Sequence, residues 1–129
     1  MTEHPNAALY REGWEKFQIG DTESVAALMD DDIVWWQIGA AEPLRGKAAV
    51  LGSMEAFEGV EFDIDIHDVL ANDEHLVALV TATVRAGDQE LTYRTAEIQH
   101  VEDGKVTERW AFSDDTERIN TFFSQFDQG

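Results

Sequence analysis

The stretch "VEFDIDIHDVLA" (residues 60–71) alternates apolar and acidic side chains with a period of two. Its apolar side chains point to one side of an extended chain: Phe62, Ile64 and Ile66. A strand with this alternation has one face in the core and the other in water. The stretch therefore predicts a β-strand that belongs to an antiparallel sheet.

Three further strand-like segments follow: "HLVALVTATVRA" (75–86), "QELTYRTAEIQHV" (89–101) and "KVTERWAF" (105–112). The short sequences "NDE", "GD" and "EDG" separate the four segments, and each is typical of a turn between antiparallel strands. We therefore expect a four-stranded antiparallel meander.

Outside the meander the apolar residues follow a helical period, apart from one further strand expected at residues 32–38. The expected helices are 7–19, 23–29, 47–57 and 114–126, and residues 1–6 are expected to be loose. Helices segregated from the sheet indicate an α+β fold of one domain, 1–129, with the helices packed on one face of a curved, mostly antiparallel sheet. A ligand is then expected between the helices and the sheet.

The charge balance excludes several kinds of partner. The chain of 129 residues has 27 acidic and 9 basic residues and a net charge of −18. Nucleic acids and anionic membranes both require a basic surface, so we expect neither as a partner. Two interpretations of the acid excess stay open: a protein from a high-salt cytoplasm, or an ordinary acidic protein.

Localisation and redox chemistry follow from what the sequence lacks. No apolar run approaches the about 20 residues that span a bilayer, and the first residues do not form a basic-then-apolar leader. We therefore expect a cytoplasmic protein. The chain has no cysteine, which excludes disulfides, thiolate nucleophiles and cysteine-based metal sites.

Four segments carry a family resemblance: "GD…ALMDDDIVWW", "LRGKAAV", "HDVLANDEHLVAL" and "VEDGKVTERWAFSDD". Together they resemble the SnoaL-like (polyketide cyclase and ketosteroid-isomerase-like) branch of the nuclear transport factor 2-like superfamily. The resemblance implies a cone-shaped α+β barrel with an apolar pocket, usually in a homodimer. It implies no single activity, because the superfamily includes isomerases, cyclases, dehydratases, epoxide hydrolases and non-catalytic binders.

The resemblance also assigns positions to the groups that ketosteroid isomerases use. Their aspartate base aligns with Gln37, which cannot accept a proton, and their helix tyrosine aligns with Gly13. Their second oxyanion donor, a carboxylic acid, has a counterpart in Glu97. The resemblance therefore argues against a conventional ketosteroid isomerase.

Glu97 is the main catalytic candidate, because a buried carboxyl group can act as an acid, a base or a hydrogen-bond donor. It shares one face of its strand with Tyr93, Thr95 and Gln99. A two-residue "DG" turn places Glu97 opposite Trp110, whereas a three-residue "EDG" turn places it opposite Arg109, which we favour slightly. The alternative interpretation is that Glu97 is a polar residue with a purely structural role, or that it faces solvent.

His67 is a second catalytic candidate, because dehydratases of the superfamily pair a histidine with an aspartate. Its neighbour Asp68 points to the opposite side of a regular strand and so cannot form this pair with it. A hydrogen-bonded structural histidine is the alternative interpretation. No histidine pair or acidic cluster has the spacing of a metal site, and we expect no metal.

The expected substrate pocket has an apolar wall and two polar contacts. The candidates for the wall are Trp14, Phe17, Trp35, Met54 and Trp110. Gln37 and Gln99 are expected to orient the substrate by hydrogen bonds. Trp36 falls on the other face of its strand, where it is a candidate contact in a homodimer.

These observations lead to one main hypothesis and two alternatives. The main hypothesis is a cofactor-independent acid–base enzyme of the isomerase, cyclase or hydratase/dehydratase type, acting on a small apolar or cyclic ligand. The first alternative is a non-catalytic binding protein for a hydrophobic metabolite. The second is a structural protein whose pocket is filled by its own side chains.

Overall fold

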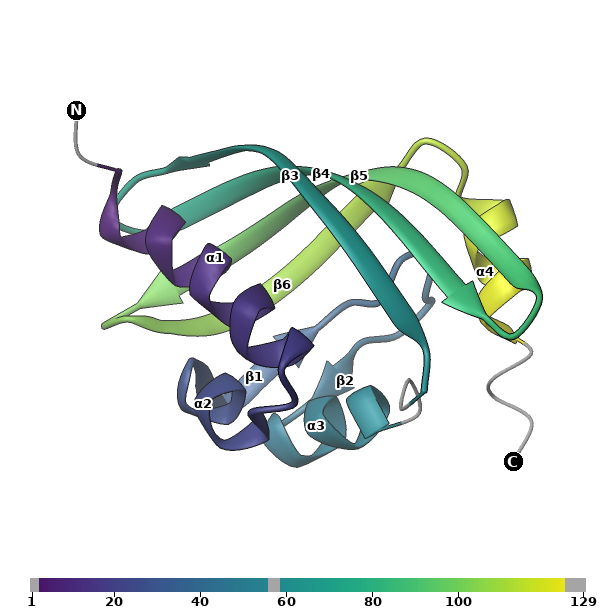
Figure 1. Ribbon diagram of the computed structural model, residues 1–129. Coiled ribbons are helices and arrows are strands. Elements are labelled where there is room, and N and C mark those ends of the chain that lie inside the picture. Colours follow the sequence, from purple (N-terminus) through teal and green to yellow (C-terminus); the bar gives the residue numbers. More distant parts are fainter. Residues whose placement is uncertain (1–2, 56–58, 125–129) are drawn as a thin grey trace.

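The computed structural model describes residues 3–55 and 59–124. In chain order the elements are α1 (Pro5–Gln18), α2 (Thr22–Ala27), β1 (Met29–Trp35), β2 (Leu44–Arg45), α3 (Lys47–Glu55), β3 (Glu61–Ala71), β4 (His75–Ala86), β5 (Gln89–Glu102), β6 (Lys105–Ser113) and α4 (Thr116–Ser124). The strands form one sheet in the order β2-β1-β6-β5-β4-β3. Figure 1 shows this sheet curving around α1, with α2 and α3 beside β1 and β2. The last helix, α4, lies at the opposite end of the sheet from α2.

The predicted meander is confirmed, because β3, β4, β5 and β6 pair antiparallel in sequence order. The remaining long strand, β1, pairs in parallel with β6 and antiparallel with the short strand β2. Four helices on a curved and mostly antiparallel sheet confirm the α+β class.

The boundaries differ from the prediction around β1. The strand begins at Met29, which pairs with Val106 of β6, and it ends at Trp35 rather than at Ile38. Leu44 and Arg45, predicted to lie in a loop, form β2 because they pair with Trp35 and Val34. The last predicted residues of the third and fourth helices, 56–57 and 125–126, lie outside the described residues.

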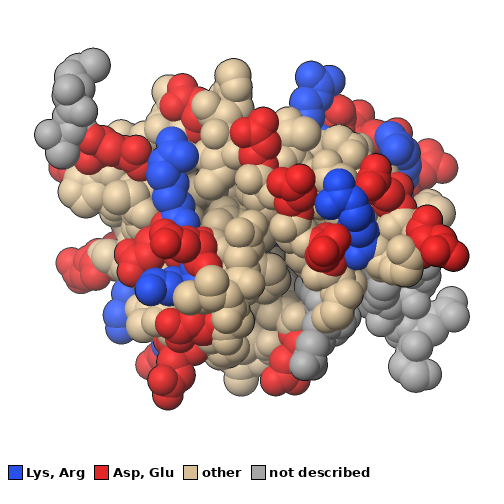
Figure 2. Space-filling model, in the orientation of Figure 1, with Lys and Arg blue, Asp and Glu red and all other residues tan. Residues whose placement is uncertain are grey.

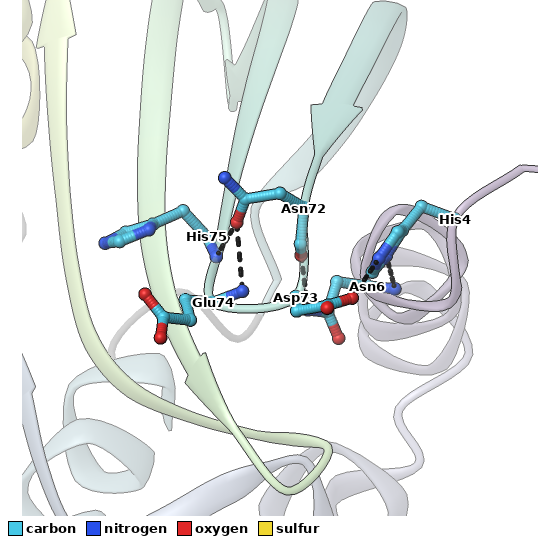
Figure 3. Close-up of polar contacts among 6 residues, drawn as sticks. All are labelled: His4, Asn6, Asn72, Asp73, Glu74 and His75. Carbon is cyan, nitrogen blue, oxygen red and sulfur yellow. Dashed lines mark hydrogen bonds and ion pairs between the residues drawn. The ribbon is translucent and has the colours of Figure 1, made fainter.

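The N-terminal residues 4–6 were expected to be loose, and this is wrong. His4 caps α1 by accepting a hydrogen bond from the Asn6 backbone N–H on its Nδ1 atom, at 3.1 Å. Its Nε2 atom lies 3.0 Å from Asp73 Oδ1, and the Asn6 side chain donates to the backbone oxygen of Asn72 at 2.9 Å. Figure 3 shows these contacts between α1 and the β3–β4 turn. They fix the start of α1 to the sheet.

Two hydrophobic clusters lie on the inner face of the sheet. The first joins α1 to the meander and contains Tyr10, Leu76, Ala78, Val80 and Val101. The second joins α2 and α3 to β1 and β6 and contains Val25, Met29, Ile33, Val50 and Val106. Leu9 packs against both clusters, so α1 lies between them.

The charged residues are spread over the surface. Figure 2 shows Asp and Glu distributed across one face of the molecule, with Lys and Arg among them rather than in one basic patch. Within residues 3–55 and 59–124, no helix combines the length and the apolar character that crossing a membrane requires.

Candidate functional site

A cavity of about 570 Å³ lies between α1, the inner face of the sheet and α4. One part of its wall is aromatic: Trp14 and Phe17 of α1 meet edge to face at 5.5 Å between ring centroids, and Phe62 of β3 lies 5.7 Å from Phe17. Edge-to-face contacts of this kind are a favoured arrangement of aromatic pairs. The cavity therefore has an aromatic wall built from α1 and β3.

A buried ion pair lies at the surface of this cavity. Glu97 of β5 is 5% exposed, and its Oε2 atom accepts a 2.6 Å hydrogen bond from Nε of Arg109 on β6. The Gln99 amide donates to the same oxygen at a longer distance of 3.4 Å. Oε2 of Glu97 thus accepts one short, charge-assisted hydrogen bond from Arg109 and one longer hydrogen bond from Gln99.

Tyr10 of α1 completes the arrangement around Glu97. Its hydroxyl donates to Glu97 Oε1 at 2.6 Å and accepts a 2.8 Å hydrogen bond from Nε1 of Trp14, one helical turn further along. Burial raises the pKa of this hydroxyl far above its usual range, and the negative charge of Glu97 raises it further. Tyr10 therefore stays neutral and acts as a hydrogen-bond donor.

Arg109 is held by contacts with the end of β1. Its Nη1 atom donates to the backbone oxygen of Trp36 at 2.9 Å, and its Cζ atom lies 4.5 Å from the ring centroid of Trp35. A guanidinium group stacked on tryptophan and bonded to a carboxylate has little freedom to rotate. Arg109 is therefore fixed in place before any ligand binds.

The observed strand register differs from both predicted registers. Asp103 and Gly104 both have positive φ, 52° and 78°, and form a two-residue turn between Glu102 and Lys105. A bulge then shifts the pairing between His100 and Val101. Glu97 therefore lies opposite Ala111, and neither Trp110 nor Arg109 lies directly opposite it. Glu97 and Arg109 form an ion pair nevertheless, because the bulge leaves both side chains on the inner face.

Most of the predicted site residues line the cavity: Trp14, Phe17, Trp35, Gln37, Met54, Glu97, Gln99 and Arg109. Two do not. Trp110 lies on the outer face of β6, where its strand partner is Ile98. His67 is exposed at a bulge in β3, where the register shifts between Ile66 and Asp68, and it does not line the cavity.

Sequence reasoning missed Tyr10, because the resemblance placed the helix tyrosine at Gly13, three residues later. Tyr10 and Trp14 are spaced one turn apart on an amphipathic helix, and this spacing was the available signal. Within residues 3–55 and 59–124 no group of three or more His, Asp or Glu side chains is arranged to hold a metal ion.

A curved sheet with helices on its inner face and a cavity between them defines an NTF2-like fold, and solved structures share it. An LEH-like epoxide hydrolase of Mycobacterium tuberculosis is 20% identical, with a TM-score of 0.77 over 97% of this chain and 91% of that chain. An NTF2-like protein of Burkholderia pseudomallei is 20% identical, with a TM-score of 0.79 over 92% of this chain and 97% of that chain. A Δ5-3-ketosteroid isomerase of Mycobacterium sp. is 22% identical, with a TM-score of 0.70 over 86% and 92%.

The SnoaL-like domain family matches residues 10–109 of the sequence. The chain therefore belongs to this family, as the sequence motifs predicted. No curated protein sequence matches the chain.

Proposed function

We propose that the protein is a small-molecule enzyme that carries out acid–base chemistry without a cofactor. The observation that supports this most directly is the position of Glu97, a buried carboxylate at the cavity surface between Arg109 and Tyr10. Glu97 and Arg109 carry the only charges among the described lining residues. The proposed substrate is therefore a neutral, mostly apolar or cyclic molecule that contains a carbonyl group.

In the proposed reaction, Glu97 accepts a proton from the carbon next to the substrate carbonyl. The negative charge of the resulting enolate lies on the former carbonyl oxygen, where the Gln99 amide, a neutral group with two N–H donors, stabilises it. Return of the proton from Glu97 to another carbon gives an isomer. Attack of the enolate carbon on a second carbonyl closes a ring, and the resulting alkoxide takes the proton back from Glu97. Loss of a hydroxyl group two carbons from the carbonyl, which takes the proton from Glu97 and leaves as water, gives a dehydrated product.

Deuterium exchange tests the proton abstraction without knowledge of the product. The protein is incubated in D₂O with 4-phenylcyclohexanone, 1-tetralone or cyclohex-2-enone, and NMR follows the loss of the proton signals next to the carbonyl. We expect the wild-type protein to accelerate exchange, and Glu97→Gln to reduce the acceleration by about 100-fold or more. Glu102→Gln, at the exposed end of the same strand, is the matched control. Equal exchange in the wild type and Glu97→Gln contradicts the proposal.

One observation favours a non-catalytic binding protein as the second candidate. Both oxygens of Glu97 already accept hydrogen bonds from protein groups, as in a structural ion pair. Native mass spectrometry of freshly purified protein, beside a denatured control, distinguishes the candidates when a small ligand is present. A ligand whose mass stays unchanged on incubation supports binding, and conversion of that ligand supports catalysis.

The outer face of the sheet supports a further proposal, that the protein is a homodimer. Phe112 of β6 is 61% exposed and Leu70 of β3 is 54% exposed, and both belong to the face that points away from the helices. Ile98 and Trp110 form a cross-strand pair on the same face. Exposed apolar side chains gathered on a sheet face are suited to contact with a second copy of the same face.

A further inference from the structure

Two groups of polar side chains in the cavity differ in their hydrogen bonding. Tyr10, Glu97, Gln99 and Arg109 bond one another at one end. Tyr93 and Thr95 lie on the same face of β5, toward α4, and their hydroxyl groups form no hydrogen bond with any residue in the ranges 3–55 and 59–124. At one end of the cavity the polar groups are therefore hydrogen-bonded to one another, whereas at the other end the two hydroxyl groups are available to a ligand.

The two free hydroxyl groups have access to open space. Within the described part of the chain, no fully buried side-chain nitrogen or oxygen lacks a hydrogen-bond partner. Tyr93 and Thr95 are half-buried and line the cavity, so their unpaired oxygens face the cavity. Burial raises the pKa of Tyr93 from 10.0 to about 12, and its hydroxyl is therefore a neutral donor at physiological pH.

The surroundings of Tyr93 show what kind of group fits there. The ring of Phe123 on α4 packs edge to face on Tyr93, at 6.4 Å between centroids. Asn120 of α4 and Gln37 after β1 are exposed residues at the cavity lining and add neutral amide groups. No charged side chain among the described lining residues belongs to this end. A neutral oxygen-bearing group is complementary to it, whereas a carboxylate or an ammonium group is not.

We propose that Tyr93 and Thr95 form a second polar subsite, which binds a neutral hydroxyl or carbonyl oxygen of the ligand at the end remote from Glu97. The Cα atoms of Tyr93 and Glu97 are four residues apart on one strand, a separation of about 13 Å. The ligand is thus an elongated apolar molecule with an oxygen function at each end. This inference rests on the proposed function for the reacting end but concerns binding alone.

Two rigid ketones that differ by one hydroxyl group test the subsite. 4-(4-Hydroxyphenyl)cyclohexanone has oxygens at both ends, and 4-phenylcyclohexanone lacks the phenolic one. Isothermal titration calorimetry gives the dissociation constant of each. We expect the wild type to bind the hydroxylated ketone about fivefold to tenfold more tightly, the effect of one well-formed hydrogen bond.

The variants Tyr93→Phe and Thr95→Val each remove one oxygen and keep the shape of the side chain. We expect each to reduce the preference for the hydroxylated ketone, with little change in the affinity for 4-phenylcyclohexanone. Thr81→Val is the matched control, because Thr81 lies on the outer face of the neighbouring strand β4 and does not line the cavity. It should leave the preference unchanged.

Three outcomes overturn the subsite: an unchanged preference in both variants, the absence of a preference in the wild type, or no binding of either ketone. Deuterium exchange separates this result from the proposed chemistry. If the affinity pattern holds and Glu97 has no effect on exchange, the acid–base function is wrong and the subsite stands. If exchange depends on Glu97 and the preference is absent, only the subsite is wrong.

Discussion

Tyr10 Oη donates a 2.6 Å hydrogen bond to Glu97 Oε1, across 87 positions of sequence. This bond joins the first helix to the central part of β5, and the Trp14 indole N–H supports it from the next turn of the helix. His4 and Asn6 fix the start of the same helix to the β3–β4 turn. Contacts before Tyr10 in the helix, from His4 and Asn6, and after it, from Trp14, therefore fix the position of the Tyr10 hydroxyl.

The buried ion pair is expected to contribute much more to stability than an exposed pair of similar length. Arg109 and Glu97 lie 2.6 Å apart with side chains 13% and 7% exposed, whereas Arg85 and Glu90 lie 2.7 Å apart at 43% and 56%. Loss of one partner of a buried pair leaves an uncompensated charge. In urea unfolding, Arg109→Leu should lower the free energy of unfolding by about 3–5 kcal/mol. The control Arg85→Leu should lose less than about 1 kcal/mol, and equal losses contradict the expectation.

The two tyrosines are expected to lower stability in alkali. Tyr10 and Tyr93 are the only tyrosines of the chain. Both have a pKa raised above 10.0 in the folded state, to about 12 for Tyr93. Above pH 10 the unfolded chain loses these protons while the folded chain keeps them, so the free energy of unfolding falls as the pH rises toward 12. Tyrosinate absorbance should stay absent at pH 10 until urea unfolds the protein, and Tyr93→Phe should show a shallower decline in stability. Appearance of tyrosinate near pH 10 in the folded protein contradicts the expectation.

Gly39 is expected to determine how closely α4 packs on the loop after β1. Its φ is +75°, and an added Cβ atom would collide with Asn120 Nδ2 and lie 2.7 Å from Thr116 Cγ2. Gly39→Ala should therefore displace α4 and increase amide hydrogen exchange within residues 116–124. Gly20→Ala is the control, because Gly20 has a similar φ of +77° and no atom near the added Cβ. Equal exchange of α4 in both variants would show that the close contact does not hold the helix.

Substitutions on the outer face of the sheet test the proposed homodimer, because this face is the proposed interface. Analytical ultracentrifugation of the wild type should give twice the chain mass. Phe112→Arg places a charge on this face and should shift the protein to the monomer. Ile19→Arg is the matched control, because Ile19 is 70% exposed at the end of α1, away from the sheet. A monomeric wild type, or a dimer unaffected by Phe112→Arg, contradicts the proposed interface.

Salt is expected to stabilise the protein, because screening weakens repulsion among the excess acidic residues of a chain with a net charge of −18. The melting temperature should rise between about 0.1 M and about 1 M KCl, a range in which the Debye length falls from about 10 Å to 3 Å. A continued rise at higher concentrations favours adaptation to a high-salt cytoplasm. No rise at all contradicts that interpretation.

The sequence predicts the meander and the inner face of β5 well, because a period of two is a local signal. Tyr93, Thr95, Glu97 and Gln99 alternate with residues of the other face, and all four line the cavity. The sequence cannot predict the bulge opposite His100 and Val101, because nothing in the turn "EDG" specifies that Thr107 of β6 is an extra residue in the pairing. The partner of Glu97 in the register was therefore wrong in both alternatives.

The contribution of α1 was predicted less well than that of the sheet. An amphipathic helix shows which side chains face the core, but its position along the sheet depends on tertiary contacts such as His4–Asp73. That position determines whether residue 10 or residue 13 meets Glu97. The exposed position of His67 agrees with the period of two, which assigns it to the side of β3 opposite Ile64 and Ile66.

The spacing of the inward side chains on β5 sets the distance between the two polar ends of the cavity. The rise per residue of a strand is nearly constant, so its inward side chains recur at intervals of about 7 Å. The number of residues between two inward side chains therefore determines the distance between them. Leu91 is the next inward residue beyond Tyr93. Leu91 is buried and is not among the residues that line the cavity, so Tyr93 is the last inward side chain of β5 that a ligand in this cavity meets. The length of ligand that reaches both polar ends is therefore set by the backbone of β5 between Glu97 and Tyr93.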